Sequence, residues 1–175
     1  NADTYSYSFS AKVWSAYGDQ TLNGVVWTAS ATGGNYFGYE ADRGQQFGSA
    51  ANPAKPLNLS TTGINGTITS VKVSTSGASS VVATLSVSVG GTAFTISGNT
   101  SVSISSTNTT YEFTGTGSGQ IVISWSQTSS KALYLKAIEV TSTSSPTLSA
   151  TTLESFGNVA VGTTAGPKSF TLTGS

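Results

Sequence analysis

The sequence predicts an all-β protein: an antiparallel β-sandwich of the jelly-roll type, followed by the first strands of a second β-domain. Three observations predict this fold class. Apolar and polar residues alternate with a period of two along most of the chain, glycine and asparagine turns separate the alternating runs, and no amphipathic helical period lasts beyond two turns. Short strands at such spacing are typical of sandwiches and barrels.

The first strand is expected at residues 4–13, where aromatic and then aliphatic residues alternate with serine, threonine and lysine. Continued by one residue, this alternation places Trp14 on the polar face. Tyr17 follows in a glycine-containing turn. An exposed tryptophan beside a loop tyrosine would form a flat apolar platform, whereas a bulge near Ser15 would turn the tryptophan inward.

The later strands are predicted by the same alternation. They are expected at residues 25–31, 68–73, 82–89, 93–96, 102–104, 111–113, 121–125 and 133–140. Trp27 and Trp125 each share a strand face with aliphatic residues, so both are expected in the core. Turns between the strands are expected at the Gly-Gly, Asn-Gly and Gly-Asn pairs, because glycine and asparagine tolerate positive φ.

A domain boundary is expected near residue 141. Residues 1–141 would form the jelly roll, and the Ser/Thr/Pro segment 142–146 is predicted to be a linker. Residues 147–175 read as the first strands of an immunoglobulin-like domain, which are too few to enclose a core. We therefore expect further covalently attached domains in a longer protein.

Composition excludes several function classes. The chain has no His and no Cys, which removes imidazole bases, thiolate nucleophiles and the usual zinc, haem and iron–sulfur ligands. With 7 basic and 7 acidic residues the formal net charge is zero, which argues against nucleic-acid binding. No apolar stretch approaches the length of a membrane span, so membrane insertion is not expected.

The densest group of polar and aromatic residues lies between residues 33 and 48. Its candidate ligand-binding residues are Tyr36, Tyr39, Glu40, Asp42 and Arg43, with Trp14 and Tyr17 from the preceding turn. Rings stack on the C–H faces of sugars, and a guanidinium can bind a carboxylate or sulfate in bidentate fashion. The alternative interpretation is a solvated hairpin with a weak surface ion pair.

Catalysis is not expected. A glycosidase needs two opposed carboxyl groups, and Glu112 and Glu139 are most simply solvent-facing residues of strands. No cofactor is expected. A structural Ca²⁺ ion is an alternative that the sequence leaves open, and its oxygen ligands would come from Asp19, Asn35, Glu40 and Asp42.

Residues 5–140 resemble a β-sandwich module of secreted, multi-modular proteins from Bacteroidetes-type bacteria. The segments that carry the resemblance are 21–28, 38–49, 52–55, 74–79 and 132–140. The last segment is similar to the closing strand of galactose-binding-like and carbohydrate-binding jelly rolls. Where many of these have an aspartate pair, this sequence has Lys136 and Ala137.

The resemblance implies a non-catalytic carbohydrate-binding module, secreted or on the cell surface, that holds a multi-modular protein near a polysaccharide or oligosaccharide. One alternative is a structural spacer or adhesion module without a small ligand. Another is an accessory domain of a secreted nuclease or protease, which the zero net charge disfavours for the nuclease.

Overall fold

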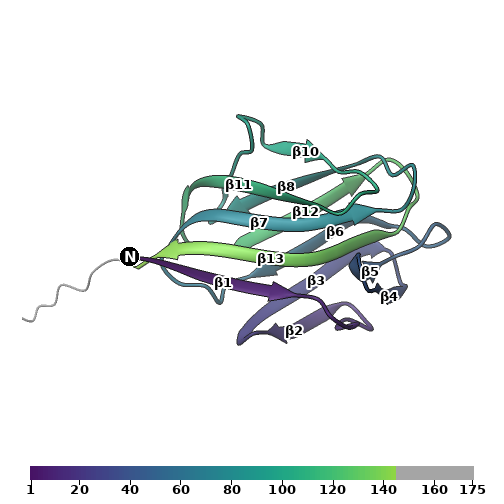
Figure 1. Ribbon diagram of the computed structural model, residues 1–175, viewed down its shortest axis with the longest axis horizontal. Coiled ribbons are helices and arrows are strands. Elements are labelled where there is room, and N and C mark those ends of the chain that lie inside the picture. Colours follow the sequence, from purple (N-terminus) through teal and green to yellow (C-terminus); the bar gives the residue numbers. More distant parts are fainter. Residues whose placement is uncertain (145–175) are drawn as a thin grey trace, which may run out of the picture. The chain divides into compact units, whose positions relative to one another are not determined.

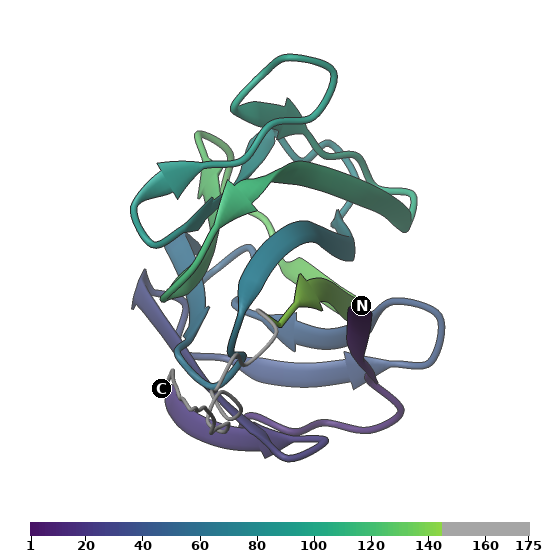
Figure 2. The ribbon, with the colours of Figure 1, turned by 90° about the vertical axis from the view of Figure 1, so that its left-hand side faces the viewer.

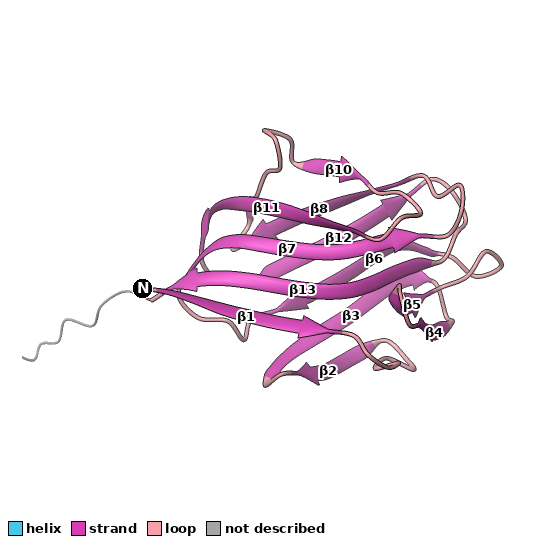
Figure 3. Ribbon diagram, viewed as in Figure 1, coloured by secondary structure: helices cyan, strands magenta, loops and turns pink. Residues whose placement is uncertain are grey.

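The computed structural model describes residues 1–144. Every regular element in this range is a strand, and the 13 strands form two antiparallel sheets, here called sheet A and sheet B (Figure 1, Figure 2, Figure 3). The predicted fold class, an all-β antiparallel sandwich, is confirmed. Within residues 1–144 no helix could cross a membrane.

Sheet A is organised around its central strand, β13 (Leu133–Thr143). One edge of β13 pairs with β7 along its length, and the other pairs first with β5 and then with β1. The remaining strands of sheet A are β1 (Ala2–Ser8), β4 (Phe37–Glu40), β5 (Gly44–Phe47), β7 (Thr67–Gly77) and β11 (Thr109–Gly117).

Sheet B has the order β10-β8-β12-β6-β3-β2, with β9 added beside β8. Its strands are β2 (Gly18–Leu22), β3 (Val25–Gly33), β6 (Ala54–Thr61), β8 (Ala83–Val89), β9 (Thr92–Ala93), β10 (Ser101–Ser103) and β12 (Ile121–Gln127). Asn23 and Gly24, with φ of 47° and 82°, join β2 to β3 in the two-residue turn that such a dipeptide favours.

The core lies between the two sheets. Trp27 and Trp125 are fully buried there, as the alternation predicted. The indole N–H of Trp125 donates to Thr75 Oγ1 of sheet A at 3.1 Å, and that of Trp27 donates to the Tyr5 hydroxyl at 3.1 Å. Both bonds link sheet B to sheet A, so each buried indole N–H has a partner across the sandwich.

The first strand is shorter than predicted. It ends at Ser8, and the backbone N–H of Phe9 donates to the Lys136 carbonyl at 2.9 Å before the chain leaves the sheet. The following residues fold inward because the buried side chain of Gln45 binds both the N–H and the carbonyl of Trp14. The prediction of a strand that continues through residue 13 was therefore wrong.

Other boundaries also differ from expectation. The predicted strands did not include β2, β4, β5 and β6, although β4 and β5 form the hairpin of the alternative interpretation. Only Thr92 and Ala93 are in a strand near the predicted run at 93–96. At the other end, β13 continues to Thr143, and Ser142 is 7% exposed opposite Ile68, so the first two residues of the predicted linker belong to the sheet. The predicted immunoglobulin-like segment, 147–175, lies outside the described residues.

Candidate functional site

The densest polar cluster of the sequence forms the β4–β5 hairpin at one end of sheet A. Tyr39 lies opposite Gln45, whose side chain is fully buried in the core. Gly38 lies opposite Gln46, and Gln46 is in turn paired with Tyr134 of β13. Because side chains alternate along a strand, these last three residues share the outer face of sheet A.

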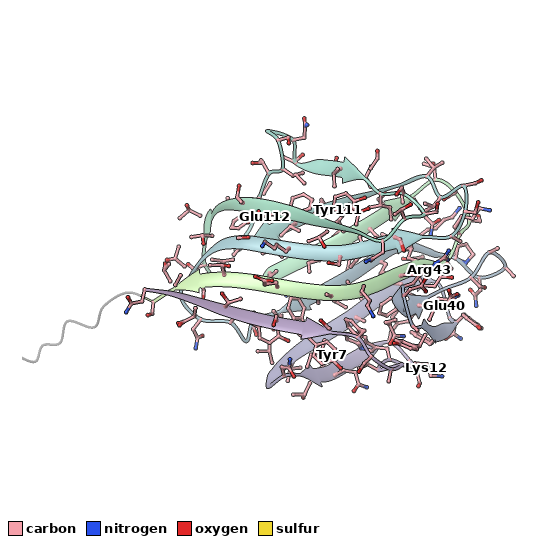
Figure 4. The ribbon with its side chains drawn as sticks, viewed as in Figure 1. Tyr7, Lys12, Glu40, Arg43, Tyr111 and Glu112 are labelled. Carbon is pink, nitrogen blue, oxygen red and sulfur yellow. The ribbon has the colours of Figure 1, made fainter. Side chains whose placement is uncertain are left out.

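An aromatic ring and an ion pair meet on this outer face. The guanidinium carbon of Arg43 lies 4.9 Å from the centre of the Tyr134 ring, within cation–π distance. The Tyr134 hydroxyl donates to Glu40 Oε2 at 3.1 Å, and Arg43 Nε lies 3.7 Å from Glu40 Oε1. Figure 4 shows Glu40 and Arg43 side by side at this end of the molecule. Tyr134 thus holds both charged partners.

An exposed ring lies beside Gly38 of the same hairpin. Tyr36 is 49% exposed and is the one aromatic residue among the well-exposed large apolar side chains of residues 1–144. A Cβ atom on Gly38 would lie 3.1 Å from Gln46 Oε1, which is a tight contact, and 3.6 Å from Tyr36 Cε2, which is an ordinary one. The absence of a side chain at Gly38 therefore mainly leaves room for the Gln46 amide. We call Tyr36, Glu40, Arg43, Gln46 and Tyr134 the Tyr134 cluster.

The charges of the cluster stay within reach of solvent. The side chain of Arg43 is 32% exposed and that of Glu40 45% exposed. Burial raises the pKa of Tyr134, and the hydrogen bond to Glu40 raises that pKa further, while Arg43 acts in the opposite direction. The phenol is therefore neutral at physiological pH and remains a hydrogen-bond donor to the carboxylate.

Lys136 fastens the hairpin to its neighbours. Its ammonium group donates to the carbonyl of Ala41 in the β4–β5 turn at 2.8 Å and to the carbonyl of Phe9 at 3.3 Å. The turn that carries Arg43 is thereby tied to both β13 and the end of β1. Such second contacts keep a surface arginine close to one conformation.

Trp14 does not form the predicted platform. Its side chain is fully buried, its ring packs against Phe9 and Phe47, and its indole N–H donates to the Gly18 carbonyl at 2.9 Å. The prediction that it lies on the polar face was wrong, because the strand ends at Ser8 and the loop folds into the core. A buried ring cannot stack on a sugar.

Tyr17 is also part of the core's edge rather than an open platform. Its half-buried ring lies between Phe37 and Phe47, with ring centres 4.8 and 6.2 Å away. Its hydroxyl donates to the Gly34 carbonyl at 2.7 Å, and burial raises its pKa to about 12.

The remaining predicted residues separate into two groups. Tyr36, Glu40 and Arg43 belong to the Tyr134 cluster, whereas Tyr39 is on the core side of β4 and Asp42 is exposed in the turn. Sequence reasoning missed Tyr134. The available signal was its position between Leu133 and Leu135, which are both fully buried, because alternation then directs the tyrosine outward.

The candidate calcium ligands are not brought together. Asp19 lies in β2 of sheet B and accepts a hydrogen bond from Thr28 Oγ1 at 2.6 Å, whereas Glu40 lies in sheet A beside Arg43. Within residues 1–144 no three acidic side chains form a group that could hold a metal ion. This donor set does not fit a Ca²⁺ site, which needs six to eight oxygens.

No protein-family model matches the chain. No curated protein is similar to it in sequence. Among solved structures, the family 29 carbohydrate-binding module CBM29-2 with mannohexaose aligns over 82% of this chain and 94% of its own, at 13% identity and a TM-score of 0.49.

Two family 36 modules align less well. The CBM36-1 domain of a multidomain xylanase from the hindgut metagenome of Trinervitermes trinervoides covers 80% of this chain and 96% of its own, with 9% identity and a TM-score of 0.39. A CBM36 in complex with calcium and xylotriose covers 79% and 98%, with 14% identity and a TM-score of 0.37.

Proposed function

We propose that this chain is a non-catalytic carbohydrate-binding module that attaches a multi-modular protein to a polysaccharide, and that the Tyr134 cluster is its binding site. The observation that carries the proposal is the exposed Tyr36 ring, which lies in the same cluster as an arginine held by Tyr134 and Glu40. An apolar ring can cover one face of a sugar while a few fixed polar groups bind its hydroxyls.

The polar groups of the cluster suit hydroxyl ligands. A guanidinium has five N–H donors, and the 3.7 Å contact of Arg43 with Glu40 involves only its Nε, while the side chain is 32% exposed. The side-chain oxygen of Gln46 and the carboxylate of Glu40 are acceptors. Donors and acceptors side by side are what a sugar hydroxyl, itself both donor and acceptor, can use.

The proposed module acts outside the cytoplasm, secreted or at the cell surface, joined to further domains. Its composition supports this setting, because 59 of 175 residues are serine or threonine and few are charged. The functional alternative is a spacer or adhesion module without a small ligand, and the burial of Trp14 favours it, since one of the predicted rings is lost to the core.

Affinity gel electrophoresis against neutral, uronic and sulfated polysaccharides separates the two functions. A binding module should be retarded by at least one polysaccharide, and Tyr36→Ala and Arg43→Ala should each weaken that retardation. Two matched controls are available. Val82→Ala removes an exposed apolar side chain directly before β8 of sheet B, and Lys12→Ala removes an exposed cation outside the cluster. Absence of retardation by every polysaccharide would support the spacer.

A further inference from the structure

The outer face of sheet A continues from the Tyr134 cluster into a hollow of about 290 Å³. We call it the sheet A groove. It is lined mainly by Ser8, Ser74, Thr110, Ala137, Lys72 and Glu139. Figure 4 looks onto this face, with Arg43 and Glu40 at one end and Glu112 on β11.

The groove exists because one row of the sheet carries small side chains. Thr110, Ser74, Ala137 and Ser8 are cross-strand neighbours on β11, β7, β13 and β1. The register shift between Leu135 and Ala137 places the alanine on the outer face and returns Ile138 to the core, where it is 1% exposed. A β-bulge of this kind re-aims the side chains that follow it.

The next row along the strands carries one lysine and two glutamates. On β7, Lys72 is the cross-strand neighbour of Glu112 on β11 and of Glu139 on β13. Its Nζ lies 4.0 Å from Glu139 Oε2. Glu112 Oε2 accepts a hydrogen bond from Ser70 Oγ at 2.8 Å. Both glutamates face solvent, as their strand positions predicted.

With the hairpin end included, the cations Arg43, Lys72 and Lys136 equal in number the carboxylates Glu40, Glu112 and Glu139. Lys72 and Arg43 each lie near a glutamate, and Lys136 is bound by two backbone carbonyls. Such an arrangement produces little long-range field, so it does not attract a polyanion.

We propose that the sheet A groove is a second contact region for the ligand of the Tyr134 cluster, and that this ligand is an extended, uncharged polysaccharide chain. This inference rests on the proposed function. Tyr134 is three residues from Ala137 and five from Glu139 on β13, which corresponds to roughly 10 and 16 Å at the rise of a β-strand. A single sugar unit cannot contact both regions, whereas a chain lying along β13 can.

Isothermal titration with neutral oligosaccharides of increasing length tests the groove. The hexasaccharide of a neutral glucan or mannan should bind the wild type at least about tenfold more tightly than the disaccharide, a difference of about 1.4 kcal/mol. Ala137→Tyr fills the floor of the groove and should abolish this gain while leaving disaccharide binding unchanged. Ser8→Tyr, at the end of β1, should act in the same direction.

Ser30→Tyr is the matched control, because it adds the same ring to an exposed strand position of sheet B. If Ala137→Tyr and Ser8→Tyr bind the hexasaccharide like the wild type while Tyr36→Ala does not, the groove is not a contact region and the proposed function stands. Tighter binding of polygalacturonate or dextran sulfate than of neutral chains would overturn the inferred ligand class. If the wild type binds no oligosaccharide, both proposals fail.

Discussion

The Tyr134 hydroxyl donates a hydrogen bond of 3.1 Å to Glu40 Oε2, so a buried residue of the central strand positions a carboxylate at the tip of the β4–β5 hairpin. The same tyrosine ring lies under the Arg43 guanidinium. An exposed ion pair usually contributes little because both side chains must be ordered. Here the tyrosine orders them, which is why we expect this pair to act as a preformed site.

Tyr134→Phe tests the role of the hydroxyl. The variant keeps the ring beneath Arg43 but leaves Glu40 without its donor, so we expect unfolding to become easier by about 1 kcal/mol. Sugar binding should weaken by a smaller factor than in Arg43→Ala. Urea denaturation gives the stability, and calorimetry on the folded variant gives the affinity. Equal loss of affinity in the two variants would contradict the expectation that the guanidinium matters more for binding than the hydroxyl.

Gly44→Ala should destabilise the hairpin that carries Arg43. Gly44 has φ of +88°, and a Cβ there would lie 2.7 Å from Lys136 Cα and against the Leu135 carbonyl. The left-handed conformation alone costs about 1–2 kcal/mol for an alanine, and the backbone contact adds to it. Gly24→Ala is the control, because Gly24 has φ of +82° with open space around it. Denaturation midpoints that shift equally in both variants would contradict the packing argument.

Trp14 should matter for stability and not for binding. Trp14→Ala removes a fully buried indole, and we expect it to cost about 3–5 kcal/mol. Trp14→Phe should cost less and leave a folded protein whose affinity for oligosaccharide equals that of the wild type. Thermal unfolding and titration calorimetry measure the two effects. A specific loss of affinity in folded Trp14→Phe would restore this residue to the binding site.

Alkaline pH should destabilise the protein through Tyr17. Its pKa is raised by burial from about 10 to about 12, so the folded state holds the proton more tightly than the unfolded state. The contribution is complete below pH 10 and is lost as pH rises toward 12. Tyr17→Phe should show a smaller fall in denaturation midpoint across this window. A wild-type midpoint that stays constant from pH 9 to 12 would contradict the burial of the phenol.

The strands of the sandwich could be predicted because their signal is local. Val25–Gly33 and Ile121–Gln127 alternate apolar and polar residues, and their tryptophans are in the core as expected. The end of the first strand could not be predicted in this way. Gln45, which lies in sequence some thirty residues later, draws the backbone of Trp14 inward, and alternation contains no information about such a partner.

The site was predicted in part for the same reason. Tyr36, Glu40 and Arg43 are close in sequence, so their grouping was visible in the residues themselves. Tyr134 is 94 residues from Glu40, and only the pairing of β13 with β5 brings the two together. The sheet A groove depends on the bulge at Lys136, whose register shift is set by pairing with β7 rather than by the local pattern.

The most direct test of the account is the dissociation constant of the double variant Tyr36→Ala/Arg43→Ala for the polysaccharide that binds the wild type best. Both side chains are at the surface, so the variant should unfold at nearly the wild-type temperature. We predict at least about tenfold weaker binding, because the ring and the fixed guanidinium are both removed. A dissociation constant equal to that of the wild type would contradict the assignment of the Tyr134 cluster as the binding site.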